Sequence, residues 1–147
     1  MTVPRVVLDT NVCLDLFLFH DAQCARLLAA LQGGLVHAVT REDCRSEWRR
    51  VLHYPQLPVD ENDRAAVNAA FDALVHCLPP APLATGLPMR LPRCADPDDQ
   101  KFLELAVVSG ARWLLSKDHE LLKLDRRTRK LAQFAVVMPH AWALAPH

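Results

Sequence analysis

Apolar positions along the chain follow two alternating patterns. Short runs rich in β-branched residues have the length of buried strands, and they occupy residues 3–8, 35–39, 112–116 and 134–138. Between them, apolar side chains recur every three or four residues, which predicts amphipathic helices. The expected helices span residues 22–32, 41–52, 60–77, 96–109 and 118–124. The proline-containing residues 53–59 and 78–93 are expected to be loops, and residues 126–130 a basic turn.

Strands that alternate with helices in this way favour a parallel sheet with helices on both of its faces. We therefore expect an α/β fold, a three-layer α/β/α sandwich with a mainly parallel central sheet. The length of 147 residues is typical of one domain, so residues 1–147 are expected to form a single domain. In such sheets, binding sites form outside the carboxyl ends of the strands. Asp9 and Asp118 each follow an apolar run and would lie at that edge.

The composition is that of an ordered protein without net charge. Hydrophobic residues make up 51% of the chain and charged residues 23%, and 17 Lys and Arg balance 17 Asp and Glu. This balance gives no overall field that would attract nucleic acid or a membrane surface. No apolar run reaches the roughly 18–20 residues of a transmembrane helix, and the first residues lack a signal-peptide pattern. We expect a cytoplasmic protein with no membrane partner.

The cysteines do not predict a disulfide framework or a zinc ribbon, because their number is odd and no C-x-x-C pair occurs. They are Cys13, Cys24, Cys44, Cys77 and Cys94. We expect small buried side chains in a reducing compartment. A zinc site that combines the first two cysteines with His20 is a weaker alternative, because no second pair of ligands completes it.

One acidic residue interrupts the apolar face of a predicted helix. Glu47 lies beside Trp48 on the stripe of the helix over residues 41–52. A carboxylate at such a position needs a cationic partner or a bound cation, because its burial without one is costly. An ion pair with an arginine such as Arg50 or Arg93 would explain Glu47 without any function, and the two explanations stay open.

Other acidic residues stand at the strand ends and at one helix start. Asp9 could form an Asx turn, and Asp96 and Asp118 could cap helices. Capping does not explain why Asp96, Asp98 and Asp99 crowd a single turn, where each added charge increases the repulsion. Carboxylates that come from two strand ends, one helix start and a buried helix face form a hard oxygen donor set, which suits Mg²⁺ or Mn²⁺. Phosphodiester hydrolysis is the reaction that such a set best supports.

The segments around these acidic residues resemble the PIN-domain nucleases. The matching stretches are VVLDTNV at residues 6–12, SEWRRVL at 46–52, DPDDQKFLELA at 96–106 and SKD at 116–118. The third stretch is the most specific, and the branch that the chain resembles contains the toxins of toxin–antitoxin systems, the VapC-like proteins. The similarity spans nearly the whole chain, although residues 55–93 carry no motif.

The resemblance implies a Rossmann-like fold and a Mg²⁺- or Mn²⁺-dependent endoribonuclease that acts on single-stranded RNA. It assigns catalysis and metal binding to Asp9, Glu47, Asp99 and Asp118, with Asp96 as an additional candidate ligand. Asn11 and Ser116 match positions that orient the acids by hydrogen bonds. Glu120 stands where the family often has another acid, two places after the last one. The resemblance also implies a cognate antitoxin protein and a homodimer in which the tail around Trp142 could take part.

Basic residues follow the last of these acids in the sequence. Lys117, Arg126, Arg127 and Arg129 could be a solvated face or a flank that binds RNA phosphates without base specificity. The three tryptophans are expected in the core or at an interface and not as platforms for base stacking. Two other functions remain as alternatives. One is a catalytically silent PIN-like module that binds RNA or protein. The other is an aspartyl phosphatase, which is disfavoured because Asn11 stands where its general acid would be required.

Overall fold

A computed structural model describes residues 2–79 and 91–144 of the chain. Five parallel strands form one sheet in the order β3-β2-β1-β4-β5, which confirms the parallel sheet expected from the sequence. The strands are β1 (Arg5–Leu8), β2 (His37–Thr40), β3 (Val75–Cys77), β4 (Trp113–Leu115) and β5 (Ala135–Val137). Strand β1 is central, with Val7 opposite Val39 of β2 and Leu114 of β4.

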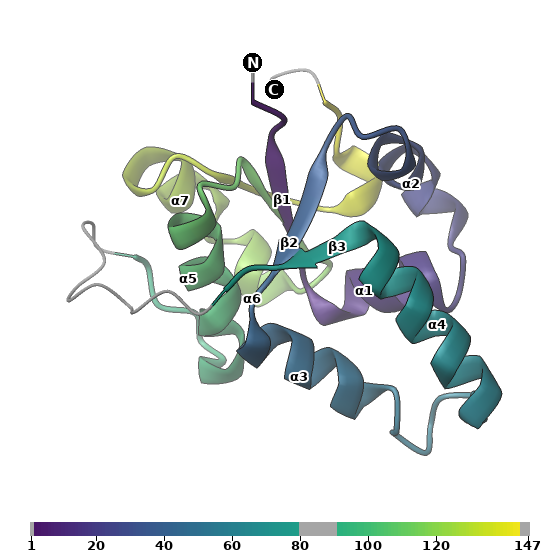
Figure 1. Ribbon diagram of the computed structural model, residues 1–147. Coiled ribbons are helices and arrows are strands. Elements are labelled where there is room, and N and C mark those ends of the chain that lie inside the picture. The colour runs from purple at the N-terminus through teal and green to yellow at the C-terminus, as the bar shows by residue number, and fades with distance from the viewer. Residues whose placement is uncertain (1, 80–90, 145–147) are drawn as a thin grey trace.

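Helices cover both faces of the sheet, so the three-layer α/β/α architecture is also confirmed (Figure 1). The helices are α1 (Thr10–Phe17), α2 (Ala25–Gln32), α3 (Glu42–Val51), α4 (Glu61–Leu74), α5 (Gln100–Ser109), α6 (His119–Leu122) and α7 (Asp125–Leu131). Short 3₁₀ turns span Ala22–Cys24, Pro97–Asp99 and Pro139–Ala141.

The core lies in two clusters because successive strand side chains point to opposite faces of the sheet. Val6 and Leu8 of β1 pack with buried residues of α1, α2 and α4. Val7, between them, packs on the other face with α5 and α6. Trp48, Trp113 and Trp142 are at most 3% exposed, so their expected place in the core is confirmed. Trp142 packs against Trp113 in an edge-to-face arrangement, with 5.4 Å between the ring centroids.

Three elements differ from the sequence-based prediction. The turn expected after Asp9 is the first turn of α1, whose eight residues include seven buried ones, so no helical period marks it in the sequence. The predicted helix over residues 60–77 ends at Leu74, because the next three residues pair with β2 as an edge strand. The expected basic turn at 126–130 belongs to α7, in which Arg129 pairs with Asp125 one turn earlier.

Local sequence signals mark two of the helix ends, and the expectation of buried cysteines holds for four of the five. Asp60 caps α4 in a reciprocal capping box with Asp63. Gly110 ends α5 with a φ of 69°, the left-handed conformation that a helix terminus requires. Four of the cysteines are buried and Cys77 is exposed. Most of the loop expected at residues 78–93 lies outside the described residues. None of the described helices combines the length and the apolar character that crossing a lipid bilayer requires.

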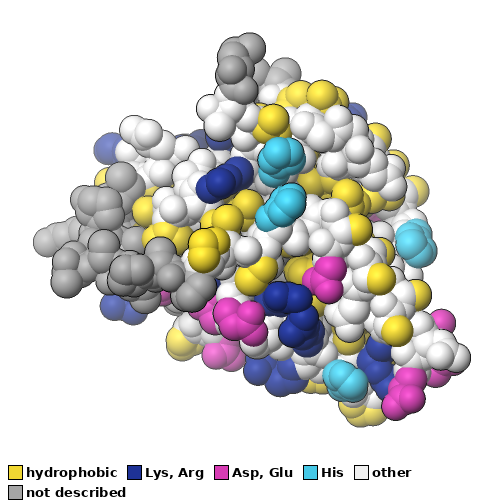
Figure 2. All heavy atoms as spheres, viewed as in Figure 1, with side chains coloured by type: hydrophobic (Ala, Val, Ile, Leu, Met, Phe, Trp, Pro, Cys, Tyr) yellow, Lys and Arg dark blue, Asp and Glu magenta, His cyan; other side chains and the backbone are white. Residues whose placement is uncertain are grey.

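Charged side chains of both signs are intermixed on the surface. Figure 2 shows acidic and basic side chains together over α3, where Arg41 pairs with Asp43 at 2.7 Å and Arg45 with Asp72 at 3.5 Å. This face therefore carries no extended field of one sign, in keeping with the zero net charge of the chain.

Candidate active site

Asp9 lies at the carboxyl end of β1, at the centre of the sheet. Its backbone N–H continues the ladder by donating to Leu115 of β4 at 3.0 Å. Although Asp9 precedes α1, its side chain makes no capping hydrogen bond to that helix. The side chain is instead only 4% exposed and accepts a hydrogen bond of 2.8 Å from the Ser116 hydroxyl. A capping role therefore does not account for Asp9.

Ser116 connects two of the acidic residues. It follows β4 and is fully buried. Its hydroxyl donates to Asp9 and accepts a 2.9 Å hydrogen bond from the backbone N–H of Asp118. Asp118 in turn caps α6 by accepting from the N–H of Glu120 at 2.9 Å. The carboxylates that follow β1 and β4 are thus held beside each other by one serine.

Asp96 and Asp99 approach the same place from a segment about 90 residues later than Asp9. Asp96 caps the 3₁₀ turn that leads into α5 by accepting from the N–H of Asp98 at 3.0 Å. Asp99 makes no capping hydrogen bond and is half-buried. Asp98 is exposed and does not line the cavity described below.

The crowding of these carboxyl groups alters their ionisation. Burial raises the pKa of Asp99 to about 7, and the contact with Asp118 and the charges of Asp9 and Asp96 act in the same direction. Burial also raises the pKa of Asp9, against the hydrogen bond from Ser116, which lowers it. Neighbouring carboxylates destabilise one another's negative charge, and a bound cation would relieve this repulsion.

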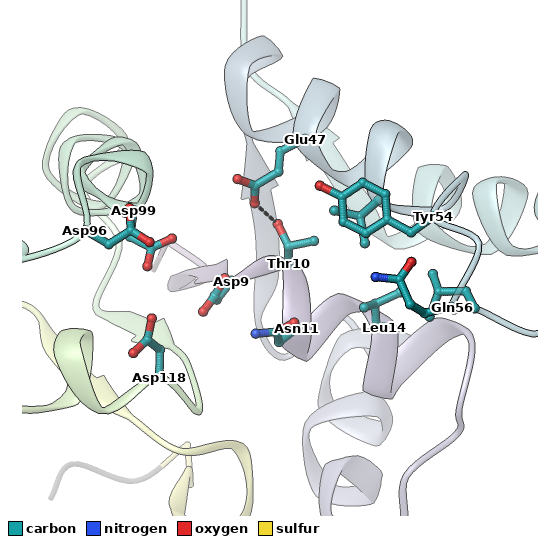
Figure 3. Close-up of a pocket in the computed structure, with 12 residues that line it drawn as sticks. Asp9, Thr10, Asn11, Leu14, Glu47, Tyr54, Gln56, Asp96, Asp99 and Asp118 are labelled. Carbon is teal, nitrogen blue, oxygen red and sulfur yellow. Dashed lines mark hydrogen bonds between the residues drawn. The ribbon is translucent and has the colours of Figure 1, made fainter.

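Glu47 projects from α3 toward the same place but is already paired. One carboxylate oxygen accepts a hydrogen bond from the Thr10 hydroxyl (Figure 3), and the other lies 2.8 Å from the Lys101 ammonium. The cationic partner of Glu47, which the sequence suggested would be an arginine, is therefore Lys101 of α5. Both charged side chains are less than one-fifth exposed, so the pair is largely shielded from water.

Thr10 and Lys101 were not identified from the sequence. Nothing in the sequence around Thr10 indicates that its hydroxyl bonds to Glu47. Lys101 could have been recognised, because it lies in the first turn of α5, where a cation interacts unfavourably with the helix dipole unless an acidic partner is present.

The five acids and Thr10 line a cavity of about 350 Å³, within the range of about 300–1,000 Å³ typical of ligand sites. Figure 3 shows the carboxylates of Asp96, Asp99 and Asp118 at one end, with Asp9, Thr10 and Asn11 in the middle. Figure 3 shows Leu14, Tyr54 and Gln56 at the other end, and Val51 and Leu57 also line the cavity. Asn11 is exposed and lies beside Asp9. The structure therefore brings together every acid that the sequence analysis selected.

The donor set fits a hard divalent cation. Asp9, Asp99 and Asp118 supply carboxylate oxygens, and Asp96 lies next to them, whereas none of the described residues contributes a thiol or imidazole to the cavity. Among the described residues, no three His, Cys, Asp or Glu side chains stand close enough to enclose an ion as they are placed. A cation would therefore have to draw the carboxylates together on binding.

The basic residues expected to contact RNA lie outside the cavity. Lys117 is 2.5 Å from the buried carboxylate of Asp15, and Arg129 is 2.9 Å from Asp125. Arg126 and Arg127 are exposed on α7. The pairing of Lys117 with Asp15 fixes the chain between Ser116 and Asp118 to α1, a structural role that the sequence did not indicate.

Comparisons with known proteins agree with this arrangement. The family model described as PIN domain matches residues 5–120. A solved structure with a similar fold is that of VapBC2 from Rickettsia felis bound to a DNA fragment from their promoter, with a TM-score of 0.58. The match covers 90% of this chain and 96% of that chain at 9% sequence identity, so the likeness is one of fold. No curated protein matches the sequence.

Proposed function

Because this chain belongs to the PIN-domain family, we propose that it is an endoribonuclease that hydrolyses phosphodiester bonds of single-stranded RNA with the help of Mg²⁺ or Mn²⁺. The observation that carries the proposal is the convergence of Asp9, Asp99 and Asp118 in one cavity at the carboxyl ends of β1 and β4. Hard carboxylate donors beside a cavity of nucleotide size are what a phosphodiesterase of this kind requires.

Asp9, Asp99 and Asp118 would hold the ion, with Asp96 as a further ligand. A bound divalent ion supplies Lewis-acid chemistry, which activates water and stabilises the leaving oxygen of a phosphodiester. Ser116 orients Asp9 and the backbone of Asp118, so that two of the ligands are fixed before substrate arrives. Lys101 neutralises Glu47 and thereby limits the negative charge that faces a phosphate. Glu47 acts in this proposal as the fourth acid, and Asn11 as an orienting residue at the exposed rim.

The wider biological role belongs to the same proposal. The resemblance to VapC-like proteins and the fold shared with VapBC2 support a toxin of a toxin–antitoxin pair, encoded with a cognate antitoxin protein and active in the cytoplasm. We also propose that the chain acts as one domain over residues 1–147 and as a homodimer. Expression of the chain alone should then arrest growth, whereas Asp99→Asn should not, and gel filtration should give twice the mass of the chain.

The activity is tested by cleavage of a labelled single-stranded RNA with Mn²⁺ or Mg²⁺, with and without EDTA. Cleavage should require the metal and should be lost in Asp9→Asn and Asp99→Asn. Asp98→Asn is a matched control, because it changes an adjacent acid that lies outside the cavity. Circular dichroism should show that all variants are folded.

Two results would contradict the proposal. Cleavage that persists in EDTA or in Asp99→Asn would show that the carboxylates and their metal ion do not take part in the reaction. RNA binding without any cleavage by the folded, metal-loaded protein would favour the catalytically silent module instead.

A further inference from the structure

The end of the cavity opposite the carboxylates is built by the loop that joins α3 to α4. Tyr54 of this loop is 44% exposed, and of the exposed large apolar side chains of the described residues it alone lines the cavity. Figure 3 shows Tyr54 and Gln56 at this end, with both side chains directed toward the middle of the cavity and the carboxylates of Asp96, Asp99 and Asp118 at the opposite end. An aromatic ring left accessible inside a cavity is available to a ligand.

The backbone of Tyr54 is held in place even though it lies in a loop. Its N–H donates to the carbonyl of Val51 at 3.0 Å, and its carbonyl accepts from the N–H of Leu57 at 3.1 Å. Pro55 lies within this turn and Pro58 directly follows it, and both restrict the backbone further. A ligand that stacks on the ring therefore meets a largely preorganised surface, and little loop entropy is lost on binding.

The residues around the ring combine apolar surface with one polar group. Leu14, which is 8% exposed, and the half-buried Val51 and Leu57 form the apolar wall. Gln56 adds a carboxamide, which can both donate and accept hydrogen bonds. None of these residues carries a charge, and Glu47, the acid nearest to them in Figure 3, is paired with Lys101. The site thus suits a flat, uncharged group with a hydrogen-bonding edge.

We propose that Tyr54, Leu14, Leu57 and Gln56 form a binding site for one unstacked base of an RNA strand whose sugar–phosphate chain continues to the carboxylate end. The inference rests on the proposed nuclease function and specifies its substrate. A base within a duplex is stacked on both neighbours and cannot enter, so this site selects for single-stranded RNA. Stacking on an aromatic ring tolerates every base, while the Gln56 carboxamide can favour some over others.

The test is a binding measurement with two probes. One is a fluorescently labelled, single-stranded RNA of 12 nucleotides and mixed sequence, and the other is the same sugar–phosphate chain without bases. Fluorescence anisotropy is measured in Ca²⁺, which also takes oxygen ligands, and a gel verifies that the RNA stays intact. The proteins are the wild type, Tyr54→Ala, Tyr54→Phe and Phe19→Ala. Phe19 is a matched control, because it is an exposed aromatic residue (51%) outside the cavity.

The wild type should bind the base-bearing probe more tightly than the base-free probe. Tyr54→Ala should weaken binding of the base-bearing probe by about 5- to 100-fold, the effect of one lost base–aromatic stack. Its affinity for the base-free probe should not change. Tyr54→Phe keeps the ring and should bind as the wild type does, and so should Phe19→Ala.

The inference is overturned if Tyr54→Ala binds the base-bearing probe as tightly as the wild type, or loses affinity equally for both probes. If the wild type still cleaves the base-bearing probe in Mn²⁺, such a result leaves the proposed function intact. Failure of the wild type both to bind and to cleave either probe would overturn the proposed function, and this inference with it.

Discussion

At the scale of single residues, the site depends on carboxyl groups that are costly to ionise together. Asp9 is buried, Asp99 is half-buried, and both have raised pKa values. Ser116 partly offsets this cost through its hydrogen bond to Asp9. The protein thus keeps repelling charges side by side, and this arrangement should be visible in its stability as well as in its activity.

The contribution of Asp99 to the stability of the metal-free protein should fall as the pH rises from about 4 to about 7. The pKa of Asp99 is about 7 in the folded chain against 3.8 normally, so the folded state holds a proton that the unfolded state has lost in this window. Asp99→Asn, which cannot ionise, should be more stable than the wild type above pH 7, by about 1 kcal/mol after allowance for the half-exposed position. Below pH 4 the two proteins should be equally stable.

Urea unfolding with EDTA at several pH values measures this difference. Asp98→Asn changes only the exposed neighbour and keeps Asp99, so its stability should vary with pH as that of the wild type does. Added Mn²⁺ should stabilise the wild type more than Asp99→Asn. A pH profile of Asp99→Asn that parallels the wild type would contradict the assignment of the raised pKa to Asp99.

Ser116→Ala should destabilise the protein most at neutral pH. The variant removes the hydrogen bond to a buried carboxylate and the acceptor of the Asp118 N–H, and such a loss costs about 1.5–3 kcal/mol. The loss should shrink in acid, where Asp9 becomes protonated and needs the donor less. Ser109→Ala is the matched control, because Ser109 is a buried serine whose hydroxyl donates to the Ala106 carbonyl at 3.4 Å and not to a carboxylate. Equal, pH-independent losses for both serines would argue against the role assigned to Ser116.

At the scale of elements, the site depends on where strands and helices end. Asp9 follows β1, Asp118 follows β4 and Asp99 precedes α5. The ends of these two strands and the start of this helix must therefore be placed accurately. Helix α5 begins at the site and ends at Gly110, from which the chain returns into β4. The N–H of Ala111 donates to the Ala106 carbonyl at 3.0 Å, which closes the helix in a Schellman motif.

Gly110→Ala should lower the free energy of unfolding by about 1 kcal/mol, because an L side chain is strained at a φ of 69°. Contact is not the cause, since an added Cβ would meet nothing within 4 Å. Gly110→Asn should lose less, because asparagine tolerates this conformation. RNA cleavage per folded molecule should stay the same in both variants. Thermal unfolding ranks the three proteins, and equal stabilities would mean that the terminus of α5 can relax.

At the scale of the whole molecule, the electrostatics are local. The net charge is zero, and ion pairs neutralise much of the surface, including Lys117 and Arg129. Attraction of RNA must then come from individual exposed cations and not from the overall charge. Helix α7 carries two exposed arginines, Arg126 and Arg127.

Replacing Arg126 and Arg127 by Gln should weaken RNA binding equally for all sequences. The slope of log K against log salt should become smaller by about 1, as expected for lost phosphate contacts on a single strand. Replacing Arg5 and Arg112, at the amino ends of β1 and β4, changes the net charge equally and should leave the slope unaltered. An equal effect of both pairs would mean that net charge, not position, governs binding, and no effect of either would make α7 a solvated face.

The sequence by itself determined the layers and the identity of the acids. The runs that became β1, β2, β4 and β5 are buried on both faces of the sheet and therefore read as continuous apolar segments. Capping at Asp60, Asp96 and Asp118 was likewise predictable, because it is a local property of the chain. The PIN-domain motif of the chain, which the family model confirms over residues 5–120, also lies in such local stretches.

Only the tertiary structure decided what these residues contact. Helix α1 is nearly all buried and β3 forms by pairing with β2, so neither shows a periodic pattern. The partner of Glu47 is Lys101, 54 residues away, and Tyr54 reaches the cavity through a loop without a motif. The pKa of Asp99 depends on Asp9 and Asp118, which folding alone brings to its side. Local patterns encode which elements form, but contacts between distant segments depend on packing and solvent exclusion, which no local pattern contains.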